Sequence, residues 1–341
     1  MMGSPPHPLS APFLFPLSFL FRWGVAFRHL LFRWRIKKTR RAPIPVISIG
    51  NIHIGGTGKT PLTALLAKEL LRHSEGAILS RGRNKIAGNS LFFSAEDCPV
   101  YSRCGDEIRL LADQIPNCQY GVGKDRLASA RRAKEKGCRW VLLDDGMQCL
   151  SLSSDFSLII LPCDDPLGKK GFLPFGPLRD HPQRLSKADA IFVNGTPCDL
   201  SPIRQYTDAP LIGCSMVPRG IRWITPNGEG DIRGKRVGTF CGLGRPRSFL
   251  NSIVEWGSES ILHHSLYDHQ AISKEPLLRF SKKAKEKGAH AIICSQKDAV
   301  KLPPSPSSLL PIGYLISRLE ITQNLPAWQE LIHSIQDNIT R

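Results

Sequence analysis

The fold of this chain is decided by Val46-Ile47-Ser48-Ile49-Gly50-Asn51-Ile52-His53-Ile54-Gly55-Gly56-Thr57-Gly58-Lys59-Thr60-Pro61. The β-branched first part indicates a strand, and the leucines that follow at helical spacing indicate a helix. Between them lies a glycine-rich turn that ends in Gly-Lys-Thr, the order found in P-loops. In a P-loop, backbone N–H groups point at phosphate oxygens, the lysine reaches the outer phosphates and the threonine hydroxyl binds Mg²⁺. The stretch therefore predicts a nucleoside triphosphate site.

The spacing within this loop departs from the usual P-loop. The strict pattern has a glycine five residues before Gly58, where this chain has His53. Because a strand pattern precedes the loop and a helix pattern follows it, we still expect phosphate contacts. The residues expected to bind ATP are Gly55, Gly56, Thr57, Gly58, Lys59 and Thr60. An ordinary turn between a strand and a helix is the alternative.

Short apolar runs alternate with helical patterns from Pro45 to about residue 215. The expected strands are 46–49, 77–80, 140–143, 158–161 and 190–193, and the expected helices are 62–72, 106–115 and 125–136. Such alternation is typical of a parallel sheet covered by helices on both faces. The sequence therefore predicts an α/β fold built on a P-loop NTPase-like parallel sheet.

Composition divides the chain into five expected parts. Prolines and glycines crowd residues 218–235, which suggests a linker or a hairpin. A second, smaller α/β unit follows, with expected strands at 236–240 and 291–294 and expected helices at 247–256 and 275–287. The parts are a basic N-terminal segment 1–42, a P-loop domain 43–217, the linker 218–235, a second domain 236–322 and a C-terminal helix 323–341 that returns to the first domain.

The chain carries a large excess of positive charge. Its 46 lysines and arginines against 29 aspartates and glutamates give a net charge of +17. Such a charge attracts phosphate, anionic lipid or nucleic acid without distinguishing them. The ten cysteines form no CxxC pair and show no zinc-ligand spacing, so we expect reduced thiols in a cytosolic chain.

The N-terminus is unlike the rest of the chain. Residues 9–36 are rich in phenylalanine, leucine and tryptophan, and a basic run at 37–41 follows them. A signal peptide has its positive charge before the apolar part, whereas here the basic run follows it. A membrane-spanning helix needs about 20 mostly apolar residues, and Pro12, Pro16, Arg22 and Arg28 interrupt this stretch. An interfacial amphipathic helix fits better. Its apolar side chains are Trp23, Phe27, Leu30, Leu31 and Trp34, and its basic ones are Arg22, Arg28, Arg33 and Arg35.

This segment carries no acidic residue, since the first one in the chain is Glu69. We therefore expect residues 9–41 to contact an anionic membrane surface, where each nearby basic residue contributes about 1 kcal/mol. A helix that packs its apolar face on the protein itself is the alternative.

An acidic pair follows the expected strand at 140–143. Asp144-Asp145-Gly146 has the form of a Walker B element, and ligands collect at the carboxyl ends of parallel strands. The two carboxylates could hold Mg²⁺, directly or through water, opposite Lys59 and Thr60. A solvated turn is the alternative.

Asp106 and Glu107 form a second acidic pair at the start of an expected helix. Adjacent helical residues diverge by about 100°, so the two carboxylates would do separate jobs, one at a metal-bound water and one as a base. Acidic residues also favour helix N-termini for electrostatic reasons alone. Arg179 ends a loop stiffened by proline and glycine, which suits oxyanion recognition or a plain surface salt bridge.

Taken together, these residues resemble the tetraacyldisaccharide 4′-kinases of lipid A biosynthesis. The matching segments are 50–61, Ser80-Arg81-Gly82, Gly105-Asp106-Glu107, Asp144-Asp145-Gly146-Met147-Gln148, 173–179, Val193-Asn194-Gly195, Asp268-His269 and 297–301. They occur in order from about residue 45 to 302, and the unusual P-loop spacing is itself a trait of this family.

The resemblance implies transfer of the γ-phosphate of ATP to the 4′-hydroxyl of a tetraacylated glucosamine disaccharide 1-phosphate. It implies a peripheral enzyme on the cytoplasmic face of the inner membrane. It also implies two α/β/α domains joined by a β-strand linker, with an N-terminal helix that touches the bilayer.

The family's residue roles transfer onto matching positions. The resemblance implies that Asp106, assisted by His269, removes the proton of the sugar hydroxyl, which is a poor nucleophile at neutral pH. It implies that Gln148 and Arg179 bind substrate. The implied Mg²⁺ ligands are Thr60, Asp144, Asp145 and Glu107.

The chain departs from the family pattern at a few positions. Cys149 and Gln270 stand where the family usually has histidines, and Ser295-Gln296 replaces a threonine-glutamate pair. The acidic residue after the loop arginine is Asp180. These positions bear on the substrate site, whereas the phosphate-binding residues match the family.

Two other functions are compatible with a basic P-loop protein. One is a P-loop NTPase that acts on nucleic acid, and the other is a membrane-bound nucleotide switch without phosphotransfer. The chain has no recognisable nucleic-acid-binding motif, and its basic residues gather beside an aromatic apolar segment, so we expect no nucleic acid partner.

Overall fold

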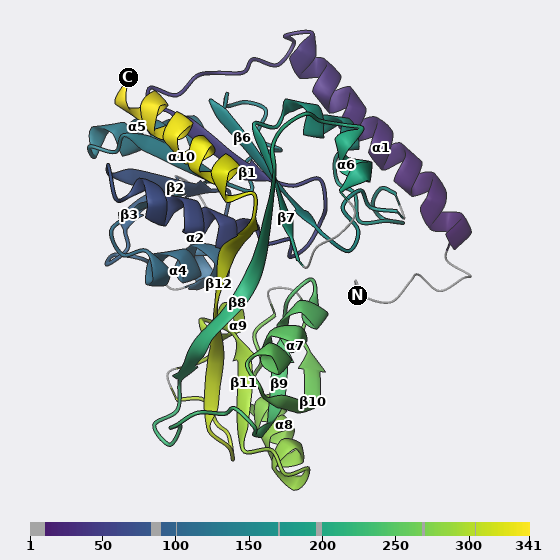
Figure 1. Cartoon of the computed structure of the whole chain (residues 1–341), viewed down its shortest axis with the longest axis vertical. Coiled ribbons are helices and arrows are strands. Elements are labelled where there is room, and N and C mark those ends of the chain that lie inside the picture. The colour runs from purple at the N-terminus through teal and green to yellow at the C-terminus, as the bar shows by residue number, and fades with distance from the viewer. Residues whose placement is uncertain are drawn as a thin grey trace. The chain divides into compact units, whose positions relative to one another are not determined.

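The structure is a computed structural model that describes residues 11–82, 90–99, 101–169, 171–195, 200–267, 270–303 and 305–341. The chain forms two compact units (Figure 1). The first, here called the P-loop unit, holds the described residues from Ala11 to Ser215 together with Leu319–Arg341. The other, here called the second unit, holds Met216–Arg318.

The P-loop unit is built on a mostly parallel sheet. Its strand order is β8-β7-β6-β1-β5-β2-β4-β3, and only the edge pair β3–β4 is antiparallel among the pairs for which a register is defined. The strands are β1 (Val46–Gly50), β2 (Gly76–Ser80), β3 (Leu91–Ser94), β4 (Gln119–Val122), β5 (Trp140–Asp144), β6 (Phe156–Pro162), β7 (Ala190–Asn194) and β8 (Leu211–Trp223). The predicted α/β fold with a parallel sheet is confirmed.

Helices surround this sheet (Figure 1). They are α1 (Ala11–Arg33), α2 (Lys59–Leu70), α3 (Tyr101–Cys104), α4 (Asp106–Gln114), α5 (Arg126–Glu135), the 3₁₀ helix η1 (Pro182–Lys187), α6 (Ser201–Arg204) and α10 (Leu325–Thr340). Every residue of β1, β2 and β5 is buried, as expected for strands covered on both faces. The C-terminal helix α10 contacts α2, and its Trp328 packs edge-to-face on Phe192 of β7.

The order of the strands positions the site. β1 lies between β5 and β6, and Ile49 pairs with Asp144 in register. The loops that follow β1 and β5 therefore leave the sheet at the same edge, where parallel strands present their carboxyl ends.

The strand order continues beyond β8 as β12-β11-β9-β10, and the pairs β10–β9, β9–β11 and β11–β12 are parallel. The elements that follow β8 are β9 (Arg236–Cys241), α7 (Pro246–Glu255), β10 (Glu259–Ser265), α8 (Lys274–Glu286), β11 (Ala291–Ser295), α9 (Gln296–Ala299) and β12 (Ile312–Gln323). Two long strands carry the chain across the boundary between the units, since β8 continues past Ser215 and β12 continues past Arg318. The segment expected to be a linker from Pro218 onward thus begins as a strand that runs to Trp223.

Candidate active site

The P-loop joins β1 to α2 through backbone that requires glycine. Gly58 has a φ of 103°, and a Cβ on it would lie 2.6 Å from Nδ2 of Asn194. The same Nδ2 donates a hydrogen bond to the carbonyl oxygen of Thr57 at 3.0 Å. The N-cap residue of α2 is Gly58 and no side-chain cap hydrogen bond is present there among the described residues, which suits a helix N-terminus that binds a phosphate.

Asn51 organises the inner side of this loop, although the sequence did not single it out as a site residue. It is fully buried. Its Nδ2 donates to Oγ1 of Thr57 at 2.5 Å, and its carbonyl oxygen accepts a hydrogen bond from Nε2 of Gln148 at 3.2 Å. Its Oδ1 accepts one from Nη2 of Arg179 at 2.6 Å. Two residues predicted to bind substrate therefore contact the phosphate loop through one asparagine.

The acidic pair lies beside the P-loop at the end of β5. Asp144 is buried, and Oγ1 of Thr63 on α2 donates to its Oδ1 at 3.1 Å. Asp145 has a left-handed backbone, with a φ of 57°, and its Oδ1 lies 3.6 Å from Nζ of Lys59. Arg179 donates to both carboxylate oxygens of Asp145. The expected neighbourhood of Lys59 and the acidic pair is therefore present.

The two aspartates have opposite electrostatic environments. Burial raises the pKa of Asp144 to about 7, and the nearby carboxylates of Glu107 and Asp145 add to the effect. Burial also disfavours the charge of Asp145, but the hydrogen bond from Arg179 and the charge of Lys59 hold the pKa of Asp145 well below its usual range. Burial lowers the pKa of Lys59. The surroundings thus favour the ionised form of Asp145 and disfavour that of Asp144.

The donor set fits Mg²⁺. Asp144, Asp145 and Glu107 offer carboxylate oxygens and Thr60 offers a hydroxyl, and Mg²⁺ prefers oxygen ligands supplemented by water and substrate phosphates. Within the described residues, however, no group of three His, Cys, Asp or Glu side chains lies close enough together to hold a metal ion, so the set of Mg²⁺ ligands stays a prediction. After burial, the negative charges of Glu107 and Asp145 raise the pKa of Asp144. A divalent cation bound here would neutralise these negative charges.

The predicted base lies at the start of α4. Asp106 is buried and follows Gly105, whose φ is 91°. The charge of its neighbour Glu107 affects the pKa of both Lys59 and Asp144. The N-terminus of α4 therefore lies near the phosphate site. Asp268 and His269 lie outside the described residues, so the pairing of Asp106 with His269 stays a prediction.

Arg126 is a candidate that the sequence reasoning missed. It is the first residue of α5, follows the N-cap Asp125 and is 8% exposed. Burial lowers the pKa of Arg126, although Cys149, Asp145 and Asp144 favour its charge. Its Nε has no hydrogen-bond partner among the described residues. A buried cation without a hydrogen-bonded carboxylate suits an anionic ligand such as a phosphate, but its sequence context resembles any basic amphipathic helix.

Helix α1 packs one face on the P-loop unit and leaves the opposite face exposed. Oγ of Ser18 donates to the carbonyl oxygen of Phe172 at 2.6 Å, and Phe15 packs edge-to-face on Phe175. The exposed side chains of α1 and the residues just after it include Leu17, Phe19, Leu20, Trp23, Phe27, Trp34 and Ile36. Of the helices in the described part of the chain, α1 included, none is long and apolar enough to cross a membrane. Packing on the protein and an apolar outer face thus coexist in one helix.

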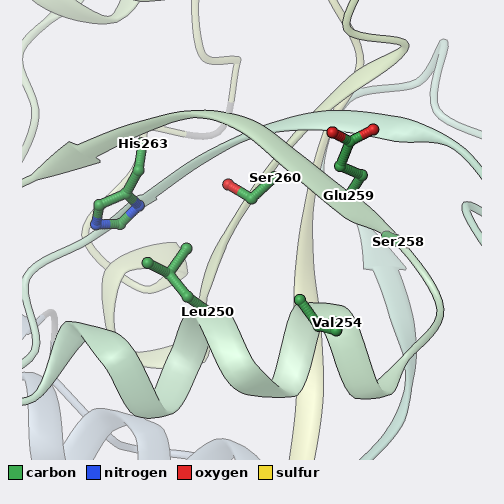
Figure 2. A pocket seen from close by; sticks show the side chains of 6 residues that line it. All are labelled: Leu250, Val254, Ser258, Glu259, Ser260 and His263. Carbon is green, nitrogen blue, oxygen red and sulfur yellow. The ribbon is translucent and has the colours of Figure 1, made fainter.

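A separate pocket of about 390 Å³ lies in the second unit between α7 and β10 (Figure 2). Its lining residues are Leu250, Val254, Ser258, Glu259, Ser260 and His263. Nδ1 of His263 lies 2.9 Å from Oγ1 of Thr239. None of the predicted site residues lines this pocket.

Comparison with known proteins agrees with this geometry. The family model for tetraacyldisaccharide-1-P 4′-kinase matches residues 10–336. A tetraacyldisaccharide 4′-kinase of Chlamydia pneumoniae is 39% identical over 294 residues, which cover 83% of this chain and 80% of that protein. The one of Chlamydia caviae is 34% identical and covers 94% of this chain and 89% of that protein.

A solved structure is similar as well. LpxK from Aquifex aeolicus, described as an "apo" form in complex with ATP, superposes with a TM-score of 0.73 at 25% identity. The match covers 95% of this chain and 98% of that one. The family match extends over nearly the whole chain and includes every segment that builds the site described above. This chain belongs to the tetraacyldisaccharide-1-phosphate 4′-kinase family.

Proposed function

We propose that this chain transfers the γ-phosphate of ATP to the 4′-hydroxyl of a tetraacylated glucosamine disaccharide 1-phosphate. The observation that carries the proposal is the joined arrangement of P-loop, acidic pair and Arg179 in a member of the 4′-kinase family. Phosphoryl transfer depends mainly on positioning and on neutralising phosphate charge, and this arrangement supplies both.

The P-loop residues Gly55–Thr60 bind the phosphates of ATP in this proposal. Thr60, Asp144, Asp145 and Glu107 hold Mg²⁺, which supplies charge neutralisation at the β- and γ-phosphates when bound. The position of Lys59 supports placing the phosphates and Mg²⁺ side by side. Its ammonium group is largely buried and lies 3.6 Å from Asp145, which follows β5.

Asp106, with His269, accepts the proton of the attacking sugar hydroxyl. The support is the placement of Asp106 at the N-terminus of a helix whose next residue, Glu107, interacts electrostatically with Lys59. Gln148 and Arg179 orient the acceptor. Arg126 binds a phosphate oxygen, because its buried guanidinium otherwise lacks a partner for Nε among the described residues.

The acceptor is a lipid, and α1 brings the enzyme to it. The exposed face of α1 combines Trp23 and Phe27 with flanking arginines, and exposed Trp34 follows directly after the helix; this is the composition of a helix that lies in a membrane interface. We place the enzyme on the cytoplasmic face of the inner membrane, where ATP and a lipid acceptor are both available.

The direct test is to incubate the protein with γ-labelled ATP and Mg²⁺, first with acylated disaccharide 1-phosphate in detergent micelles and then with DNA or RNA. Label on the lipid, lost when the 4′-hydroxyl is blocked, is the expected result. Unlabelled lipid together with ATP hydrolysis stimulated by nucleic acid would instead establish the nucleic-acid-dependent NTPase.

A further inference from the structure

Helix α1 is joined to the active site by polar contacts as well as by packing. Nε2 of His29 donates a hydrogen bond to Oδ1 of Asp180 at 2.9 Å. One residue earlier on the helix, the guanidinium of Arg28 donates to the carbonyl oxygen of Gln148. These contacts reach the two segments that carry the predicted substrate-binding residues, Gln148 and Arg179.

Asp180 is the centre of this connection. Its side chain is 2% exposed, and its Oδ1 also accepts a hydrogen bond from the backbone N–H of His181 at 2.9 Å. The guanidinium of Arg184 stands farther away, with Nε 4.0 Å from Oδ2. Burial disfavours the carboxylate, but the hydrogen bond from His29 holds the pKa of Asp180 below its usual range. A buried carboxylate that relies on a side chain of α1 binds that helix to the loop.

From Asp180 the contacts continue into the phosphate site. The backbone N–H groups of Arg179 and Asp180 both donate to the carbonyl oxygen of Ile52, at 2.8 Å and 3.3 Å. The guanidinium of Arg179 then bridges Asp145 and Asn51. Asp180 is thus the chain neighbour of the residue that makes this bridge, and the backbone N–H groups of both residues share one acceptor.

We propose that His29 and Asp180 are positioning residues, through which docked α1 holds Arg179 in its bridge between Asp145 and Asn51. The inference rests on the proposed kinase function of that bridge. The helix that presents the apolar outer face thus also positions a residue of the active site. Release of α1 from the P-loop unit therefore slows phosphoryl transfer itself. An ordinary membrane tether would change only how often enzyme and lipid meet.

The test compares His29→Ala, Asp180→Asn and the double variant in kcat and in KM for ATP and for the lipid acceptor. Each single variant should lower kcat by about tenfold or more, since small misplacements of catalytic groups have effects of this size. The double variant should be no slower than the slower single one, because both changes break the same contact. His29→Gln retains a donor on a side chain of similar reach and should restore much of kcat.

A matched control lies on α10, where His333 and Asp337 form an exposed pair with 3.7 Å between Nε2 and Oδ2. His333→Ala makes the same substitution at an exposed histidine–aspartate pair outside the site, so kcat should not change. Hydrogen–deuterium exchange of residues 172–181 should rise in His29→Ala and stay unchanged in His333→Ala.

An increase in the acceptor KM at constant kcat, or additive losses in the double variant, would overturn the positioning role. Unchanged exchange at residues 172–181 would also overturn it, and this readout does not depend on the reaction. If the wild-type protein transfers no phosphate to the lipid, the proposed function fails, and the exchange measurement still decides whether α1 holds the loop. Should His29→Ala lose helix content, the His29→Gln variant keeps the comparison decisive.

Discussion

Arg179 donates hydrogen bonds to both carboxylate oxygens of Asp145, through Nη1 to Oδ2 at 2.9 Å and through Nη2 to Oδ1. The same Nη2 donates to Oδ1 of Asn51 at 2.6 Å. One guanidinium therefore joins the loop after β5 to the loop after β1. The planar fork of arginine fits this two-loop bridge, whereas a lysine offers a single point charge.

Arg179→Lys should keep the positive charge and lose the bridge. We expect kcat to fall by about tenfold or more, because the two-point contact cannot be made by an ammonium group. Steady-state kinetics with ATP and lipid acceptor measure the effect, and circular dichroism checks the fold. Full activity in the lysine variant would show that charge alone is needed.

Gly58→Ala should damage the phosphate loop. Its φ of 103° is unfavourable for alanine, and the added Cβ would lie 2.6 Å from Nδ2 of Asn194. We expect weaker ATP binding by isothermal titration and a lower melting temperature. Gly24→Ala on α1 is the control, because a Cβ there has no neighbour within 4 Å and should leave ATP affinity unchanged. Equal ATP affinity of the two variants would argue against the loop geometry described here.

Asp106→Ala should slow phosphotransfer by about a hundredfold or more and leave ATP binding largely intact, since general-base catalysis contributes about 10²–10⁴. The control is Asp113→Ala on the same helix, which removes a partly exposed carboxylate paired with Arg109. Single-turnover rates at saturating ATP separate binding from chemistry. Near-normal turnover of the Asp106→Ala variant would show that Asp106 is not the catalytic base.

Asp180→Asn should lower stability in a pH-dependent way. Because the folded-state pKa of Asp180 is depressed, its contribution is present above the unfolded-state pKa near 4 and is lost as the pH falls through the folded-state value. The difference in melting temperature between wild type and variant should be present around pH 7 and shrink below about pH 4. Asp337→Asn, at a 55% exposed side chain, should show little difference at either pH. A constant difference across this range would contradict the assignment.

Trp23→Glu combined with Phe27→Glu should weaken sedimentation with vesicles that contain anionic lipid. Both side chains are exposed, 62% and 58%, so the melting temperature should stay nearly unchanged. Val254→Glu, at a 67% exposed apolar side chain in the second unit, should leave vesicle binding unaltered. Equal vesicle binding by wild type and the double variant would remove α1 as the membrane contact.

The sequence identified the central strands well, because β1, β5, β6 and β7 are continuous apolar runs that the burial of a parallel sheet demands. It did not identify β3, β4, β8, β10 or β12. The run Gln119–Val122 is short and contains a glycine, and Leu211–Trp223 contains Pro218, so local propensity argues against strands there. Pairing with neighbouring strands overrides that propensity.

By itself, then, the sequence determined the phosphate chemistry, because Gly58, Lys59 and Thr60 are adjacent along the chain and act through local backbone geometry. Tertiary structure decided which distant side chains complete the site. Asn51 and Arg179 are separated by 128 positions, and His29 and Asp180 by 151. Such contacts depend on strand order and on the docking of a helix against a loop, and no local pattern encodes either.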